Sequence, residues 1–186
     1  MRLFIATTFP AEVLRAVNER VDRVRPRLPQ ASWVRPGSQH LTFAFLGDQS
    51  DALVPKIESE VEQELRNVSA FEARLQGCGF FPNPRHARVG WVGVTPEEDF
   101  RRVAVAARSG TERAGITLDG SDFKAHLTLM RIRSTWPPAS IELFHGALRG
   151  FESDRFAVDR VTLFSSQLDP AGAIHTPLHE FALRSH

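Results

Sequence analysis

Two short stretches of this sequence combine an imidazole and a hydroxyl at the same spacing. They read His40-Leu41-Thr42-Phe43 and His126-Leu127-Thr128-Leu129. Alternate side chains of an extended strand share one face, so in each stretch the His and the Thr point one way and their apolar neighbours the other. Two imidazoles that titrate near neutrality suit a reaction in which one removes a proton from a nucleophile while the other protonates a leaving oxygen. Threonine hydroxyls would donate to anionic oxygens, so the pattern indicates acid–base chemistry at an anionic group.

The repetition of the motif carries more weight than either copy. A single His-x-Thr on a strand is usually structural, because Thr favours strands and a half-buried imidazole is an ordinary polar group. Here Leu3 precedes His40 by 37 positions and Val89 precedes His126 by the same 37, with one expected helix in each interval. Packing alone gives no reason to keep the polar pair on one strand face twice. The functional interpretation is therefore favoured over the structural one.

The rest of the chain alternates between apolar strand-like runs and amphipathic helical segments, punctuated by Pro and Gly. We expect strands at residues 2–8, 40–46, 71–75, 88–94, 126–132, 156–164 and 179–183. Helices are expected at 10–24, 51–67, 96–114 and 137–148. One strand-helix-strand-helix-strand unit used twice about a pseudo-twofold axis would place the two motif strands beside each other or across a groove.

The composition is that of an ordinary globular domain. The 186 residues carry 23 Lys plus Arg against 22 Asp plus Glu, and 42% are hydrophobic, which excludes a disordered chain or a coiled coil. The one cysteine, Cys78, has no internal disulfide partner, and no Cys/His spacing is typical of a zinc site. No stretch of the sequence has the length of a membrane span, so we expect a cytoplasmic protein with no membrane association.

The paired motifs resemble those of the two-histidine (2H) phosphoesterases, specifically the RNA 2′,3′-cyclic phosphodiesterase branch, historically called 2′-5′ RNA ligases (the LigT or ThpR type). Five segments follow the order of that family: RLFIATTFP, HLTFAFLG, FFPNPRHARVGWVGV, HLTLMR and SSQLDPAGAIHTPLHEFAL. The resemblance implies an α+β fold of two pseudo-symmetric lobes, each a mainly antiparallel sheet with helices on its outer face, around a central groove. We expect one bilobal domain over residues 1–186, with repeats at roughly 1–80 and 85–170 and a C-terminal strand.

The resemblance also implies an activity and roles for five residues. The activity is metal-independent opening of a 2′,3′-cyclic phosphate at the end of an RNA to leave a 2′-phosphate, with 2′-5′ ligation as a side activity. By analogy, His126 is the general base that activates water and His40 the general acid that protonates the departing 3′ oxygen. Thr42 and Thr128 would hold the non-bridging phosphate oxygens, and Arg131 would supply a cation. The residues alone leave open which histidine is the acid. No metal and no cofactor are implied, and the expected partner is an RNA with a cyclic end, bound by a monomer.

Four positions depart from the simplest form of this pattern. Arg131 has the opposite strand parity to His126, so a regular strand would turn it away from the groove unless a bulge redirects it. The family often has a basic residue where Ala44 stands, a Pro where Ala125 stands and a Tyr where His175 stands. The chain contains no Tyr at all.

Other side chains receive structural interpretations, and two other functions stay open. Phe80, Phe81 and Trp91 could stack on bases, but core packing is the expected role, as it is for Cys78. The first alternative function is a non-catalytic protein that binds RNA ends or nucleotides. The second is a 2H phosphodiesterase that acts on small cyclic phosphates.

Overall fold

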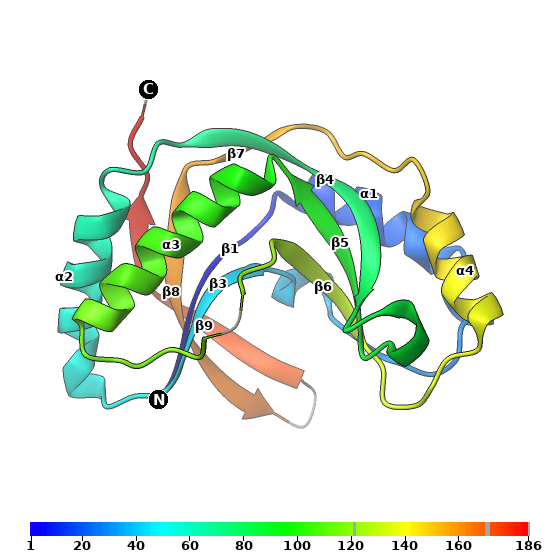
Figure 1. Cartoon of the computed structure of the whole chain (residues 1–186), viewed down its shortest axis with the longest axis horizontal. Coiled ribbons are helices and arrows are strands. Elements are labelled where there is room, and N and C mark those ends of the chain that lie inside the picture. Colours follow the sequence, from blue (N-terminus) through cyan, green and yellow to red (C-terminus); the bar gives the residue numbers. More distant parts are fainter. Residues whose placement is uncertain (121, 170–171, 186) are drawn as a thin grey trace.

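Two antiparallel sheets form the inside of the molecule, and the helices cover their outer faces (Figure 1). The computed structural model describes residues 1–120, 122–169 and 172–185, so Pro170 and Ala171 of the segment SSQLDPAGAIHTPLHEFAL lie outside the description. The strands are β1 (Arg2–Thr7), β2 (Ser32–Trp33), β3 (Leu41–Asp48), β4 (Phe71–Phe81), β5 (Val89–Thr95), β6 (His126–Arg131), β7 (Phe156–Val158), β8 (Arg160–Asp169) and β9 (Gly172–Ala182). The α-helices are α1 (Ala11–Asp22), α2 (Val54–Leu65), α3 (Glu97–Arg113) and α4 (Pro138–Leu148). The predicted α+β fold with two antiparallel sheets is confirmed.

Each sheet takes strands from both halves of the chain. The first sheet has the order β3-β1-β8-β9, and the second has the order β2-β6-β5-β4-β7. The two orders correspond, with β3, β1 and β8 of the first sheet equivalent to β6, β5 and β4 of the second. Helices α2 and α3 pack together and contact β9 and β3 of the first sheet, whereas α4 contacts α1 and β4 of the second. The two sequence repeats meet near residues 80–85, at the end of β4 and in its connection to β5. These two strands are paired in the second sheet, so the boundary between the repeats is not a boundary between the lobes.

The two motif strands carry the same irregularity at the same place. In β3, Ala44 pairs with Ile5 of β1 and the next pair is Thr42 with Ala6, so the register passes over Phe43. In β6 the register passes over Leu129 in the same way. A bulge of one residue reverses the alternation of side chains beyond it. This is the device that Arg131 requires, because it returns the guanidinium to the groove face of β6.

Three expected strands differ from those observed. The last strand, expected at 179–183, is β9 and begins at Gly172, because it pairs with β8 along its whole length. The single strand expected at 156–164 divides into β7 and β8, which belong to different sheets, because the chain crosses from one sheet to the other there. The strand expected to end at Leu75 continues to Phe81 as β4. Gly77 has a φ of 74° and lies where the register with β5 shifts between Leu75 and Cys78, so a glycine-assisted bulge continues the strand where the sequence indicated a bend.

The close approach of α2 and α3 depends on Gly110, which gives a prediction for stability. A Cβ at this position would lie 2.6 Å from Val61 Cα and 2.8 Å from the Glu60 carbonyl oxygen, and backbone cannot yield cheaply. We expect Gly110→Ala to lower the free energy of unfolding by about 2 kcal/mol, as overpacking does. The control is Gly146→Ala in α4, where a Cβ meets nothing within 4 Å and should be neutral or stabilising. Urea denaturation of both variants tests this, and equal stability of the two would contradict it.

Candidate active site

Backbone carbonyls fix the orientation of both motif imidazoles. His40 Nδ1 lies 2.8 Å from the Ser38 carbonyl oxygen, and His126 Nδ1 lies 2.7 Å from the Lys124 carbonyl oxygen. A carbonyl can only accept, so in the neutral ring Nδ1 carries the hydrogen and Nε2 carries the lone pair. The acceptor stands two residues before the histidine in both motifs. The two rings therefore share one tautomer, and each keeps Nε2 free to exchange a proton.

Burial and positive neighbours favour the neutral form of both imidazoles. Burial lowers the pKa of His40 to about 4, helped by the charges of His175, Arg131 and His126, while the Ser38 carbonyl opposes the shift. Burial and the Arg131 charge also lower the pKa of His126. Arg131 therefore lies within electrostatic reach of both rings, as expected if the bulge in β6 turns it into the groove. No carboxylate contributes to either shift, so the described surroundings of the two rings are positive.

The remaining predicted site residues lie where an anion could reach them. Thr42 and Thr128 are half-buried at matching places in β3 and β6. Arg131 is exposed and forms no ion pair with a described residue. Its charge is thus available to a ligand. Ala44 is buried in the core.

The contact of His175 with His40 was not predicted from the sequence. The sequence pattern identified His175 only as a replacement for Tyr, but its ring lies edge-on to His40 with centroids 5.1 Å apart and 4.9 Å from the Phe4 ring. Phe4 itself lies 4.9 Å from the His40 ring. The proximity arises because β9 pairs with β8, which pairs with β1 beside β3. No spacing in the sequence contains that information.

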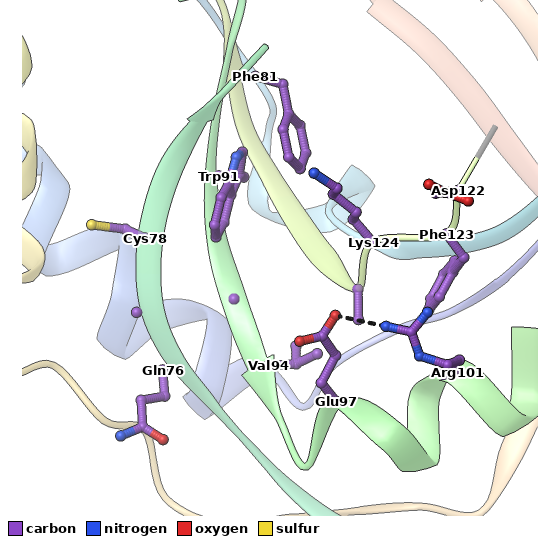
Figure 2. Close-up of a pocket in the computed structure, with 13 residues that line it drawn as sticks. Gln76, Cys78, Phe81, Trp91, Val94, Glu97, Arg101, Asp122, Phe123 and Lys124 are labelled. Carbon is purple, nitrogen blue, oxygen red and sulfur yellow. Dashed lines mark hydrogen bonds and ion pairs between the residues drawn. The ribbon is translucent and has the colours of Figure 1, made fainter. Parts of the chain in front are cut away.

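A pair of aromatic rings lies against His126, which corrects the expectation that both belong to the core. Phe80 is 4% exposed and packs inside, but Phe81 and Trp91 are half-buried on the opposite face. The Phe81 ring stacks on Trp91 at 5.1 Å and stands edge-on to His126 at 4.8 Å. Trp91 lies flat because Gly79 has no side chain: a Cβ there would lie 2.5 Å from the indole. Figure 2 shows the two rings side by side.

Neither a metal cluster nor a membrane helix is found in the part of the chain that the structure describes. No group of three or more His, Cys, Asp or Glu residues is placed to hold a metal ion in residues 1–120, 122–169 and 172–185. Within the same residues, no helix is long and apolar enough to cross a membrane. Cys78 is half-buried against the core, as expected, and burial raises the pKa of its thiol.

Two antiparallel sheets that each present a His-x-Thr pair from equivalent strands are the arrangement of a 2H phosphoesterase. The model of the 2′-5′ RNA ligase superfamily matches residues 13–170. The chain belongs to this superfamily.

Individual relatives agree over nearly the full length. The RNA 2′,3′-cyclic phosphodiesterase of Thermus thermophilus is 35% identical over 192 residues, covering 99% of this chain and 91% of the relative. The crystal structure of the Thermus thermophilus protein TT0787 superposes with a TM-score of 0.79 at 31% identity, covering 100% of this chain and 99% of that one. E. coli LigT complexed with 3′-AMP gives a TM-score of 0.72 at 25% identity, covering 98% of this chain and 97% of that one.

Proposed function

We propose that this protein is an RNA 2′,3′-cyclic phosphodiesterase that opens the cyclic phosphate at an RNA end to a 2′-phosphomonoester. The observation that carries the proposal is the matched pair of imidazoles, each held by the carbonyl two residues before it and each next to a threonine on the groove face. The names of relatives that share its full length support the substrate. The reaction as proposed uses only side chains, without metal or cofactor, and is carried out by a monomer in the cytoplasm.

The proposed reaction needs one proton removed and one delivered. His126 Nε2 takes a proton from water while the water oxygen bonds to phosphorus. The bond from phosphorus to O3′ breaks in line, and O3′ takes the proton of His40. The products are a 2′-phosphate and a 3′-hydroxyl, and the two rings exchange protons with solvent before the next turnover. Such paired acid–base catalysis requires the two groups on opposite sides of phosphorus.

Three side chains are proposed to stabilise the charge that develops on the non-bridging oxygens. Thr42 and Thr128 donate through their hydroxyls, and Arg131 adds a guanidinium cation. Such fixed donors are effective because they are already oriented when the charge develops. The phosphate anion also raises the pKa of both histidines, which supplies the protonated acid that the free protein lacks.

A group of arginines next to Arg131 supports a polynucleotide substrate. Val89 pairs with Arg131, and the neighbouring Arg88 donates from Nη1 to the Arg133 carbonyl oxygen at 3.0 Å. Arg85 stands in the same connection between β4 and β5, and none of these guanidinium groups forms an ion pair with a described residue. Unpaired arginines bind phosphates well. We propose that they hold the RNA backbone that leads away from the cyclic end.

The low pKa values predict an acidic optimum for kcat/KM, which reports the free protein. Catalysis requires His40 protonated and His126 neutral. The fraction of protonated His40 falls as the pH rises above its pKa of about 4, and neutral His126 is lost only below its own lowered pKa. Both limits lie below the ordinary value of 6.5, so kcat/KM should peak below pH 6.5 and fall as the pH rises. Because the two histidines interact, the two apparent pKa values of this pH profile describe the pair and not either ring alone. A pH series on the RNA substrate measures this, and an optimum above about pH 7.5 would contradict it.

The function itself is tested with an RNA oligonucleotide that ends in a 2′,3′-cyclic phosphate, incubated with EDTA and followed by ³¹P NMR. Conversion to a 2′-phosphate is expected. Tight binding of the RNA without conversion would show a binding protein instead. Faster turnover of a cyclic mononucleotide than of the oligonucleotide would indicate an enzyme for small cyclic phosphates.

A further inference from the structure

Gln39 is a buried polar side chain that the proposed reaction does not use. Its side chain is 3% exposed, and among the described residues it is the only buried side chain that carries an amide. It stands between His40 and Ser38, whose carbonyl oxygen lies 2.8 Å from His40 Nδ1. A buried amide is costly unless its donors and acceptor are paired, so its partners show what it holds in place.

Gln39 and Asn18 of α1 form a reciprocal amide pair. Gln39 Nε2 donates to Asn18 Oδ1 at 3.0 Å, and Asn18 Nδ2 donates to Gln39 Oε1 at 2.8 Å. The remaining hydrogens also have acceptors, because Gln39 Nε2 donates to the Val34 carbonyl at 3.3 Å and Asn18 Nδ2 to the Leu14 carbonyl at 2.6 Å. A polar network in which every donor is paired specifies one arrangement of the segments it joins.

The network reaches the second motif strand through Val34. The Val34 amide donates to the Leu129 carbonyl oxygen at 2.9 Å. Leu129 is the residue over which the register of β6 passes, in the bulge that returns Arg131 to the groove face. A continuous series of hydrogen bonds therefore runs from α1, through the Gln39 side chain, to the bulge of β6.

The backbone of Gln39 fixes the direction of the Ser38 carbonyl. Residues Pro36–Ser38 form a 3₁₀ turn, and the Gln39 amide donates to the Pro36 carbonyl at 3.1 Å. The Ser38 carbonyl and the Gln39 N–H belong to one planar peptide unit, in which they point in opposite directions. Whatever holds Gln39 in this turn therefore also keeps the Ser38 carbonyl directed at the His40 ring.

The other half of the fold has no equivalent of this network. Ala125 stands at the place of Gln39, directly before His126, and its side chain has no polar atom. The Lys124 carbonyl nevertheless lies against His126 Nδ1, as the Ser38 carbonyl does in the first half. The second imidazole thus serves as an internal control for the first.

We propose that Gln39, together with Asn18, is a positioning residue for His40. By holding the Ser38 carbonyl it keeps the hydrogen on Nδ1 and leaves Nε2 directed at the reacting group. The inference rests on the proposed function, in which His40 protonates the departing O3′. Gln39 acts through His40, because its buried side chain does not reach a substrate.

The test is Gln39→Leu, which fills similar space without an amide. At neutral pH, ¹⁵N NMR should show that neutral His40 becomes a mixture of the two tautomers, whereas His126 keeps its hydrogen on Nδ1. The kcat on RNA with a cyclic end should fall about tenfold to 10²-fold, the scale of a small misplacement of a catalytic group. The KM should change little. A role in stability alone would leave the tautomer of His40 unchanged.

Asn18→Ala provides a second variant, because it removes the partner from a partly exposed position and keeps Gln39. It should shift the His40 tautomer and kcat in the same direction by less. The double variant should be no worse than Gln39→Leu alone, since the two amides act as a pair. The matched control is Gln49→Leu at the other end of β3, where the amide donates to the Leu46 carbonyl at 2.5 Å. It should leave the tautomer of His40 and kcat unchanged.

The outcomes separate this inference from the proposed function. An unchanged His40 tautomer and kcat in both Gln39→Leu and Asn18→Ala would overturn the positioning role and leave the proposed function intact. An equal change at His126 would also overturn it, because the effect would then be a general loosening of the protein. If the His40 tautomer shifts as expected but the wild-type protein opens no cyclic phosphate, the proposed function fails while the hold of Gln39 on the ring is supported.

Discussion

Replacing either motif histidine by alanine should lower kcat on RNA with a 2′,3′-cyclic end by about 10³-fold, within the usual range for loss of a general acid or base. His126→Ala removes the group that accepts the proton of water, and His40→Ala removes the group that protonates O3′. Binding of an RNA that ends in a 2′-phosphate should change little, because neither ring supplies the main contact with the anion. Stopped assays and calorimetry measure the two quantities.

The control for these variants is His179→Ala. His179 is a half-buried imidazole whose Nδ1 lies 4.0 Å from the Glu58 carboxylate, outside the groove. It should keep the wild-type rate. Turnover that survives His40→Ala or His126→Ala at a similar level would contradict the proposed chemistry.

A substrate with sulfur in place of the 3′ oxygen distinguishes the acid from the base. A thiolate departs without a proton, so this substrate should restore most of the rate of His40→Ala but not that of His126→Ala. Restoration in the reverse pattern would exchange the two roles. The double variant should be scarcely slower than either single variant, because residues that act as a unit are not additive.

Removing the charge of Arg131 is expected to give the second-largest effect. Arg131→Gln should lower kcat about 10²-fold, as loss of one preorganised donor to a developing anion does. Arg131→Lys should recover part of the rate, since it restores the charge without the planar guanidinium. Arg131→Gln should also raise the pKa of His40 and His126, because the Arg131 charge lowers both. NMR titration of the two imidazoles measures that shift.

The matched control for Arg131 is Arg149→Gln, which removes the same charge from an exposed position at the end of α4. It should leave kcat and both imidazole pKa values unchanged. If Arg131 had only a structural role, Arg131→Gln would lower the stability of the protein and leave the pKa values of both imidazoles unchanged. Unaltered titrations in Arg131→Gln would therefore contradict the placement of its charge in the groove.

The local pattern of the sequence was sufficient to predict which side chains share a face in the two motif strands. Alternation along an extended chain requires only neighbouring residues, so the shared face of His40 and Thr42, and that of His126 and Thr128, could be predicted without a fold. The repetition of the motif then predicted that the two motif strands lie beside each other or across a groove, and the resemblance to the family implied the two sheets. Sequence analysis could also state what Arg131 required, namely a bulge, although it could not show that one exists. Whether a strand passes over a residue depends on the partner strand.

The amino-acid sequence was therefore enough to predict the family, the paired acid–base chemistry and the strand faces on which its residues lie. The folded chain was needed for the contact of His175 with His40 and for the position of Phe81 and Trp91 beside His126. It was also needed for the low pKa of both histidines, since burial is their largest cause. Burial, ring contacts and electric fields depend on segments far apart in the chain, and only the packing of the two sheets brings those segments together.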